Sequence, residues 1–275
     1  MSNAAAFFDL DKTIIARSST LAFGRPFYDG GLISRRAVLK AAYAQFVYVI
    51  AGADADQMDR IRDEMTALMT GWDARQVRDI VAETLHEVVE PLIYAEAASL
   101  IEQHKAAGDE IVIVSSSGEE VVGPIGEMVG ADAVIATRMI IDAQGRYTGQ
   151  IAFYAYGENK AAGIRELAAT RGWDLARCHA YSDSITDLPM LSAVGLPTAV
   201  NPDRALRRHA TEHGWPVRTF SRPVPLRSRL RPSPAVTGTA VGVGAAAVAG
   251  IAWYAARRRR PGLPASVRRP FASGS

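Results

Sequence analysis

The stretch AAAFFDLDKTIIARSS, residues 4–19, begins as an apolar run and then places two carboxylates, Asp9 and Asp11, one residue from each other. A short apolar run that ends this abruptly predicts a buried β-strand. If the chain stays extended after Asp9, both carboxylates lie on the same side of it, where two like charges repel unless a cation lies between them. The stretch therefore predicts a strand that ends in a cation-binding site.

Four later apolar runs also predict strands, and helical patterns follow them; they lie at 111–114, 133–136, 178–182 and 196–200. Strands and helices that alternate along a chain are typical of an α/β fold with a parallel, Rossmann-like sheet. Residues 138–154 differ, because DAQG lies there between two alternating runs and predicts a β-hairpin. In such a sheet, ligands bind at the carboxyl ends of the strands, which is where Asp9 and Asp11 are expected.

Residues 16–95 lack strand-like alternation and instead show apolar residues at helical spacing. Gly71 is expected to end one helix and Asp73 to cap the next, and a further helix over about 92–106 is expected to end at Gly108. We predict that 16–95 is a helical cap inserted into a catalytic core made of residues 1–15 and 96–220.

The composition narrows the function classes. With 275 residues and 48% hydrophobic content, the chain is long enough to bury a core, and its net charge of +2 indicates no field over the whole surface that would attract nucleic acid. The single cysteine, Cys178, excludes an intrachain disulfide and a cysteine-based zinc cluster. The start of the chain lacks the basic and long apolar regions of a signal peptide, so we expect a cytoplasmic catalytic domain.

The sequence changes character after Phe220. Residues 221–235 are rich in Pro, Ser and Arg and predict a linker, and residues 236–256 are uncharged. The length of that segment, its aromatic end at Trp253 and Tyr254, and the arginines of the basic tail 257–275 predict a transmembrane helix that tethers the protein to the cytoplasmic membrane. The alternative is an Ala- and Gly-rich tail that does not insert.

Hydroxyl groups follow the second predicted strand, at Ser115, Ser116 and Ser117. They either cap the helix that is expected to begin near Glu119 or present donors to an anion. Lys160 lies at a predicted helix start, where a cation opposes the helix dipole, so a purely structural role there is unfavourable.

A second acidic strand end follows residues 178–182, with Asp183 directly after the strand and Asp187 four residues later. One acidic residue after a strand commonly caps a helix. Two acidic strand ends in one sheet favour a shared site.

The four motifs FDLDKT, VIVSS, ENK and YSDSITD, in this order, resemble those of the haloacid dehalogenase superfamily. The helical insertion after the first motif is similar to the C1-type cap of its phosphoserine-phosphatase-like members, subfamily IB. The resemblance implies a Mg²⁺-dependent phosphomonoester hydrolase that acts on a small phosphorylated metabolite through an aspartyl-phosphate.

The resemblance also implies roles for single residues. Asp9 is the expected nucleophile and Asp11 the general acid and base. The expected metal ligands are Asp9, Asp183 and the backbone carbonyl of Asp11. The groups expected to hold the phosphoryl oxygens are Ser115, Ser116 and Lys160, with Thr13 and Asp187 in support.

The chain departs from this family at positions that recognise the substrate. Ser18 stands where phosphoserine phosphatases carry a glutamate that binds the substrate amino group, so L-phosphoserine is not the expected substrate. In the last motif, Ser182 and Thr186 replace the usual glycine and asparagine.

Two alternatives stay open. The predicted anchor, with the aromatic residues at 41–50, would suit a phosphatase of a phospholipid or its headgroup. A non-catalytic or phospho-accepting signalling domain would also combine clustered Asp, Ser and Lys, but would not need Asp11 as an acid. The spacing of the five histidines, at 86, 104, 179, 209 and 213, is not that of metal ligands, so we predict surface or core roles for them.

Overall fold

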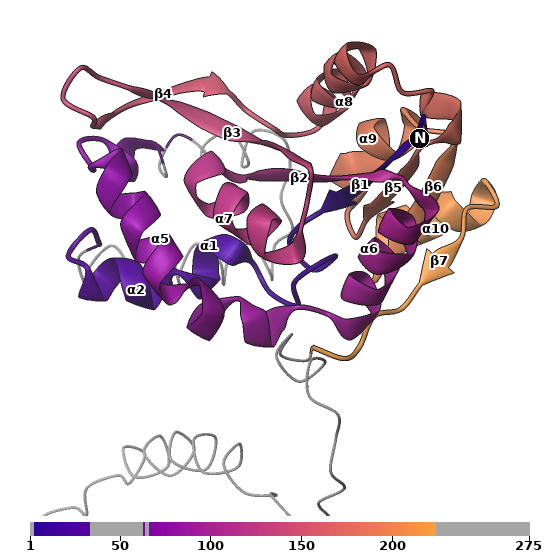
Figure 1. Cartoon of the computed structure of the whole chain (residues 1–275), viewed down its shortest axis with the longest axis horizontal. Coiled ribbons are helices and arrows are strands. Elements are labelled where there is room, and N and C mark those ends of the chain that lie inside the picture. The colour runs from indigo at the N-terminus through magenta and orange to yellow at the C-terminus, as the bar shows by residue number, and fades with distance from the viewer. Residues whose placement is uncertain (1–2, 34–62, 64–65, 224–275) are drawn as a thin grey trace, which may run out of the picture. The chain divides into compact units, whose positions relative to one another are not determined.

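The computed structural model describes residues 3–33, 63 and 66–223. Its strands form one sheet in the order β4-β3-β2-β1-β5-β6-β7, in which β4 runs antiparallel to β3 and the other pairs are parallel (Figure 1). The strands are β1 (Ala5–Asp9), β2 (Glu110–Gly118), β3 (Ala133–Ile141), β4 (Tyr147–Phe153), β5 (His179–Ser182), β6 (Leu196–Val200) and β7 (Val217–Arg218). The parallel α/β core is confirmed.

The described helices connect these strands. The α-helices are α1 (Ser19–Ala22), α2 (Gly24–Asp29), α5 (Ala74–Val88), α6 (Ala95–Ala107), α7 (Glu119–Val129), α8 (Glu158–Arg171), α9 (Leu188–Ser192) and α10 (Arg204–Glu212). The 3₁₀ turns are η1 (Glu90–Leu92), η2 (Leu175–Arg177) and η3 (Ile185–Asp187).

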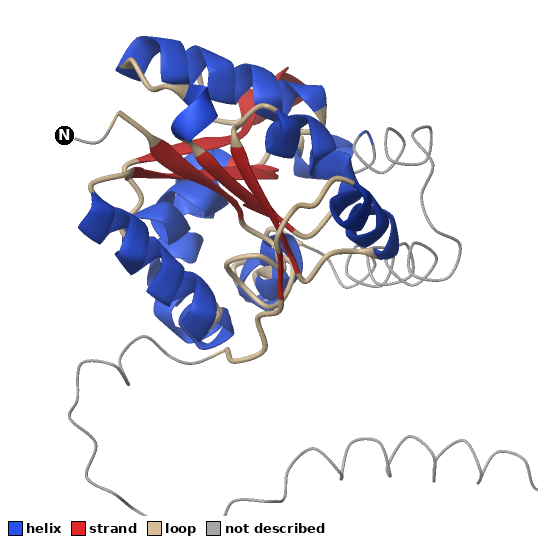
Figure 2. Ribbon diagram, turned by 90° about the vertical axis from the view of Figure 1, so that its right-hand side faces the viewer, coloured by secondary structure: helices blue, strands red, loops and turns tan. Residues whose placement is uncertain are grey.

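Helices cover both faces of the sheet, as Figure 2 shows. Alternate residues of β1 supply the two cores, because successive strand side chains point to opposite faces. Phe8 packs in one core with residues of α5, α6 and α7, and Phe7 packs in the other with residues of α8, α9 and α10. This double coverage explains why β1 is apolar along its whole length up to Asp9.

The predicted helix ends agree with the structure where it describes them. The Asp73 carboxylate accepts hydrogen bonds from the backbone N–H groups of Arg75 and Gln76, at 2.8 and 3.1 Å, and so caps α5. Gly108 ends α6 with a φ of 86°, in the left-handed region that glycine adopts without strain. The capping interpretation of Ser115–Ser117 is wrong, because Gly118 is the N-cap of α7 and no side chain bonds there.

The hairpin β3–β4 is confirmed, and it also contacts the segment that precedes α5. Gly71 N–H donates to the Tyr147 carbonyl and Tyr147 N–H donates to the Trp72 carbonyl, at 2.8 and 3.0 Å. Ala74 N–H donates to the Gly145 carbonyl at 3.0 Å. We call residues 71–74 and 145–147 the hairpin seam; it joins the sequence range of the predicted cap to the core.

Several predictions fall outside the described residues. These are the aromatic stretch 41–50, much of the predicted cap 16–95, most of the linker 221–235, the transmembrane helix 236–256 and the basic tail 257–275. No helix in the part of the chain that the structure describes is long and apolar enough to cross a membrane. The linker's first residues are described, and the Glu96 carboxylate accepts hydrogen bonds from the N–H groups of Ser221 and Arg222.

Candidate active site

The four motifs meet at the carboxyl ends of neighbouring strands. Asp9 ends β1, the serines end β2, and Asp183 directly follows β5. Since β1 lies between β2 and β5 in the sheet, segments more than 170 residues apart in the sequence come together at one edge. This is the edge at which open α/β sheets bind ligands.

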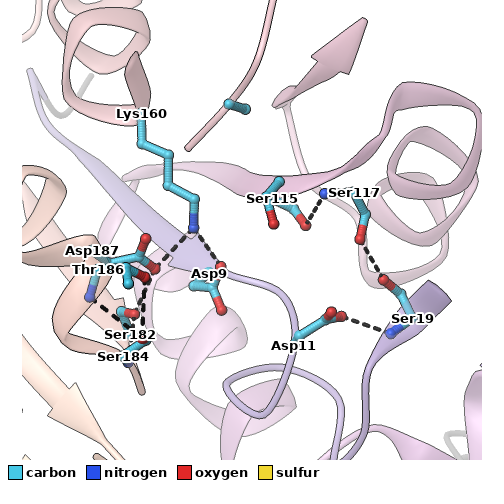
Figure 3. A network of polar contacts seen from close by, with 12 residues as sticks. Asp9, Asp11, Ser19, Ser115, Ser117, Lys160, Ser182, Ser184, Thr186 and Asp187 are labelled. Atoms are coloured by element: carbon cyan, nitrogen blue, oxygen red, sulfur yellow. Dashed lines mark hydrogen bonds and ion pairs between the residues drawn. The ribbon is translucent and has the colours of Figure 1, made fainter. Parts of the chain in front are cut away.

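Lys160 lies between two carboxylates. Its Nζ donates to Asp9 Oδ1 at 2.7 Å and to Asp187 Oδ2 at 2.8 Å (Figure 3). All three side chains are buried. Lys160 belongs to the first turn of α8, after Gly157, whose φ of 55° is in the left-handed region. A cation at this unfavourable end of a helix is held by the two carboxylates rather than by the helix dipole.

Burial and charge act in opposite directions on this group. Burial raises the pKa of Asp9 well above its ordinary value, and the Lys160 ammonium offsets part of that effect. Burial alone would lower the pKa of Lys160, but Asp187 and Asp9 raise it above the ordinary lysine value. Lys160 is therefore a permanent cation beside Asp9.

Asp183 adds a third carboxylate to the cluster. Only 9% of the residue is exposed, and burial raises its pKa to about 7, although Lys12 lowers it. The Lys12 ammonium lies 3.9 Å from Asp183 Oδ2 and is itself 62% exposed, so it gives little compensation. Asp183 is thus a buried carboxylate without an adequate cation beside it.

Asp11 does not lie beside Asp9 as an extended strand would place it. The chain turns after Asp9, with Lys12 at a φ of 58° and the N–H groups of Ile14 and Ile15 bonded to the Leu10 carbonyl. Asp11 Oδ1 instead accepts a hydrogen bond from Ser19 N–H at 2.8 Å, as Figure 3 shows. Burial raises the pKa of Asp11, and its bonds to Ser19 and Ser18 partly offset this.

The three serines after β2 have different surroundings. The Ser115 hydroxyl is buried and accepts from Ser117 N–H at 3.2 Å. Ser116 is exposed, and its carbonyl accepts from the Thr137 hydroxyl at 2.7 Å. The Ser117 hydroxyl pairs with that of Ser19 at 2.8 Å, which connects the end of β2 to the residue that holds Asp11. Sequence reasoning found no sign of a role for Ser19, and for Ser117 it predicted only a helix cap or a donor to an anion.

Thr13, the remaining predicted site residue, is fully buried in the turn after Asp9. Its hydroxyl oxygen has no hydrogen-bond partner among the described residues. An unpaired buried hydroxyl is costly, so we expect it to accept or donate a bond when the site is occupied.

Two further polar residues hold the last motif. The Ser182 hydroxyl donates to Asp187 Oδ2 at 2.7 Å, so it shares that carboxylate with Lys160. Asp203 bonds the loop on both sides, because its N–H donates to the Asp183 carbonyl at 2.7 Å and its Oδ2 accepts from Ile185 N–H at 2.8 Å. Sequence analysis noted Ser182 only as a departure from the family and missed Asp203, whose place after β6 was the available signal.

The residues present fit a divalent metal ion. Asp9, Asp183 and Asp187 are buried together with the Lys160 ammonium, so the ionised cluster carries two negative charges that no buried side chain of the described residues balances. Burial is the main cause of the raised pKa of Asp9 and of Asp183, and the neighbouring carboxylates add to it. Carboxylate oxygens are the ligands that Mg²⁺ prefers, and its charge equals the deficit.

The comparisons with known proteins agree with this geometry. The sequence model of the haloacid dehalogenase-like hydrolases matches residues 6–192. The chain is 60% identical over 260 residues to an inhibition of morphological differentiation protein of Streptomyces azureus, covering 93% of this chain and 94% of that one. It is 60% identical over 257 residues to a probable phosphatase of Mycobacterium tuberculosis, covering 93% and 89%.

More distant relatives extend the picture. A phosphoserine phosphatase of M. tuberculosis is 33% identical over 219 residues, with 79% of this chain and 71% of that one covered. A solved Bordetella pertussis protein of unknown function superposes with a TM-score of 0.69 at 27% identity, covering 79% of this chain and 99% of that one. A substrate-bound phosphoserine phosphatase superposes with a TM-score of 0.58 at 18% identity, covering 84% and 98%, and shows a shared fold.

Proposed function

Because this chain belongs to the haloacid dehalogenase-like hydrolases, and is a phosphatase of their phosphoserine-phosphatase-like branch, we propose that it hydrolyses phosphomonoesters with Mg²⁺ through an aspartyl-phosphate on Asp9. The contact of Lys160 with both Asp9 and Asp187 carries the proposal. Through this contact, Lys160 supplies a permanent positive charge at the place where the Asp9 carboxylate must attack a phosphate dianion.

In the first step, Asp9 Oδ2 attacks phosphorus, since Oδ1 is held by Lys160. A bond forms between this oxygen and phosphorus as the bond from phosphorus to the leaving alkoxide breaks. Asp11 gives its proton to that alkoxide, a role supported by the burial that raises its pKa. Lys160 and the Ser115 and Ser116 groups hold the phosphoryl oxygens.

In the second step, the Asp11 carboxylate takes a proton from a water molecule that attacks the phosphorus of the aspartyl-phosphate. The bond from Asp9 to phosphorus breaks, inorganic phosphate leaves, and both carboxyl groups return to their starting states. The bond from Ser19 N–H holds Asp11 in one orientation through both steps.

Asp9, Asp183 and the backbone carbonyl of Asp11 would hold Mg²⁺, which neutralises phosphate charge when bound. Asp203 supports this assignment, because its bonds on both sides of Asp183 fix the loop that carries the carboxylate. Asp187 orients Lys160, as its 2.8 Å contact suggests.

We propose a small phosphorylated metabolite as the substrate class. Ser18 is the N-cap residue of α1 and bonds Asp11, so it offers the proposed general acid a neutral hydroxyl and no carboxylate. A substrate ammonium group would find no carboxylate from this position. We therefore expect L-phosphoserine to be a poor substrate, although one relative is described as a phosphoserine phosphatase.

The two alternatives are separable. The lipid-phosphatase alternative depends on 236–256 and 41–50, which lie outside the described residues, and a comparison of lipid phosphates with soluble ones tests it. The phospho-accepting alternative is disfavoured by the half-buried Asp11 with its raised pKa, since a domain that only accepts phosphate needs no second carboxyl group of this kind.

The decisive experiment uses the full chain, solubilised in mild detergent, and an aryl phosphate. We expect turnover with Mg²⁺, none with excess chelator, and none in Asp9→Asn under either condition. A covalent phosphate on Asp9, trapped by acid quench and detected by mass spectrometry, would support the intermediate. Full activity without metal or in Asp9→Asn would refute the mechanism.

A further inference from the structure

A second polar cluster lies at the amino ends of the strands whose carboxyl ends carry the active site. It consists of His104 near the end of α6, Asp109 just before β2, and His179 at the start of β5. Sequence spacing gave no sign of the cluster, because His179 is 70 or more positions from the other two residues. The predicted role of a satisfied core histidine fits His104, which is buried and bonded at both ring nitrogens.

The three side chains are close enough to share one ion. His104 Nδ1 lies 2.8 Å from Asp109 Oδ2, and one donor atom from each of the three residues lies within 4.8 Å of the others. Donor atoms around a tetrahedral Zn²⁺ are about 3.3 Å apart. Small side-chain rotations would therefore bring the three donors to bonding distance.

We propose that His104, Asp109 and His179 bind a divalent ion of the Zn²⁺ class at the amino end of the sheet. Two imidazole nitrogens and one carboxylate oxygen are ligands that select Zn²⁺, Co²⁺ or Ni²⁺ over Mg²⁺. The inference does not rest on the proposed function, because none of these residues belongs to the carboxylate cluster.

Tyr181 supports the ligand arrangement. Its hydroxyl lies 2.8 Å from His104 Nε2. A metal on Nδ1 leaves the ring proton on Nε2, and the Tyr181 oxygen accepts it there, which is the second-sphere bond that metal-binding histidines usually make. Phe8 fixes the same rings from β1, because it stacks on Tyr181 at 4.6 Å and meets His104 edge-on at 6.1 Å.

Burial and charge around the cluster are compatible with a bound cation. His104 is 8% and Asp109 11% exposed at the side chain, so a bound ion would be largely shielded from water. Burial lowers the pKa of His179, which keeps its ring neutral, the form that binds metals. Arg218 acts against binding, because its positive charge reaches both His179 and Tyr181.

The cluster is separate from the active site. His179 and Asp183 are four residues apart along one extended segment, which corresponds to about 13 Å. An ion at the amino end would link α6 to β2 and β5 and would bear no substrate. We therefore expect it to raise thermal stability without being required for turnover.

The test is a calorimetric titration of the metal-stripped full chain with ZnCl₂. Excess Mg²⁺ is present throughout, so that it occupies sites made of oxygen ligands. We expect one tight site in the wild type that is lost in His179→Ala and in Asp109→Asn, and about tenfold weaker binding in Tyr181→Phe. His213→Ala is the matched control, because His213 is an exposed histidine outside the cluster that stacks on the half-buried His209 at 3.9 Å.

A second readout does not depend on the variants folding. Co²⁺ added to the wild type should give the visible absorption bands of a tetrahedral site with nitrogen ligands, and Zn²⁺ should remove them. Absence of a tight site in the wild type, unchanged binding in a folded His179→Ala protein, or loss of the site in His213→Ala would each overturn the proposal.

Discussion

The two ends of β1 and β5 carry polar clusters of opposite character. At the carboxyl end, Asp9, Asp183 and Asp187 are buried with Lys160, the one buried cation there among the described residues, and the exposed Lys12 lies 3.9 Å from Asp183. At the amino end, His104 and Asp109 bond each other, and Tyr181 satisfies the other nitrogen of His104. The amino end has its hydrogen bonds largely paired within the protein, whereas the carboxyl end has more negative charge than its own residues balance.

This difference supports the carboxyl end as the place of the proposed chemistry. Buried groups that only stabilise a fold tend to be paired, because an unpaired charge in the interior is costly. The carboxyl end keeps two uncompensated negative charges, and the raised pKa values of Asp9 and Asp183 express that cost. Such a site is suited to bind a divalent cation and then a phosphate group.

The largest expected effect is on turnover at the carboxyl end. Asp9→Asn removes the proposed nucleophile while keeping the shape of the side chain, so we expect Mg²⁺-dependent hydrolysis of an aryl phosphate to fall by roughly 10⁴-fold or more. Steady-state kinetics measure this. His213 belongs to none of the four motifs and to neither cluster, so His213→Ala should keep wild-type kinetics. A similar loss of turnover in His213→Ala would mean that general damage to the fold explains the result.

The next effect is on stability at the same end. Lys160→Met leaves Asp9 and Asp187 buried without their shared cation, and removal of one partner from such a group costs about 3–5 kcal/mol. Urea unfolding of the full chain measures the loss. The matched control on the same helix is Arg165→Met, whose partner Glu158 lies 2.8 Å away at the surface and for which we expect a loss below about 1 kcal/mol. Equal losses in both variants would contradict the contrast between buried and exposed pairs.

The pH dependence of stability gives a further test of the charge imbalance at the carboxyl end. Burial raises the pKa of Asp183 from 3.8 to about 7, so between these values the folded chain retains a proton that the unfolded chain has released. The metal-free protein should therefore lose free energy of unfolding as pH rises from about 4 to about 7 through this group. Urea titrations in chelator across this range measure the slope, and Asp183→Asn should flatten it. A slope unchanged in that variant would show that Asp183 does not contribute.

The smallest expected effect concerns the loop that carries Asp183. Asp203→Ala removes the bonds to Leu206 N–H and Ile185 N–H, both 2.8 Å, and should cost about 1 kcal/mol as a lost helix cap, with a several-fold drop in kcat. Asp174→Ala is the control, because Asp174 caps η2 through Ala176 N–H at 3.0 Å and does not touch the Asp183 loop. It should lose stability and keep kcat. A drop in kcat for both would remove the positional argument for Asp203.

Much of the core could be predicted from the sequence, because its signals are local. The apolar runs that precede Asp9 and Asp183 became β1 and β5, and the DAQG turn became the β3–β4 hairpin. Parallel order brings the carboxyl ends of β1 and β5 together, so the approach of Asp9 to Asp183 followed from topology. Lys160 lies on α8 after the antiparallel strand β4, and its place in the site was implied by the family resemblance.

What could not be predicted depends on turns and on contacts between distant elements. The chain turns between Leu10 and Ile15 and Asp11 bonds Ser19 N–H, and nothing in the DLDKT letters requires that turn or the positive φ at Lys12. The Ser19–Ser117 pair and the His104–His179 approach join residues 98 and 75 positions apart, which no spacing rule addresses. The predicted cap boundaries at 16 and 95 stay a prediction.

The hairpin seam also bears on how such enzymes can be recombined. Backbone atoms of Gly71, Trp72 and Ala74 bond to Gly145 and Tyr147, and the Arg146 guanidinium donates to the Gly71 carbonyl at 2.8 Å. In a chimera that received only residues 16–95 from a relative, residues 71–74 of the hairpin seam would come from the relative and residues 145–147 from this chain. Because most bonds of the seam are made by main-chain atoms, the two parts fit together only if the length and turn geometry of the hairpin match; side-chain identity matters less. The natural unit of exchange is thus the insertion together with residues 138–153.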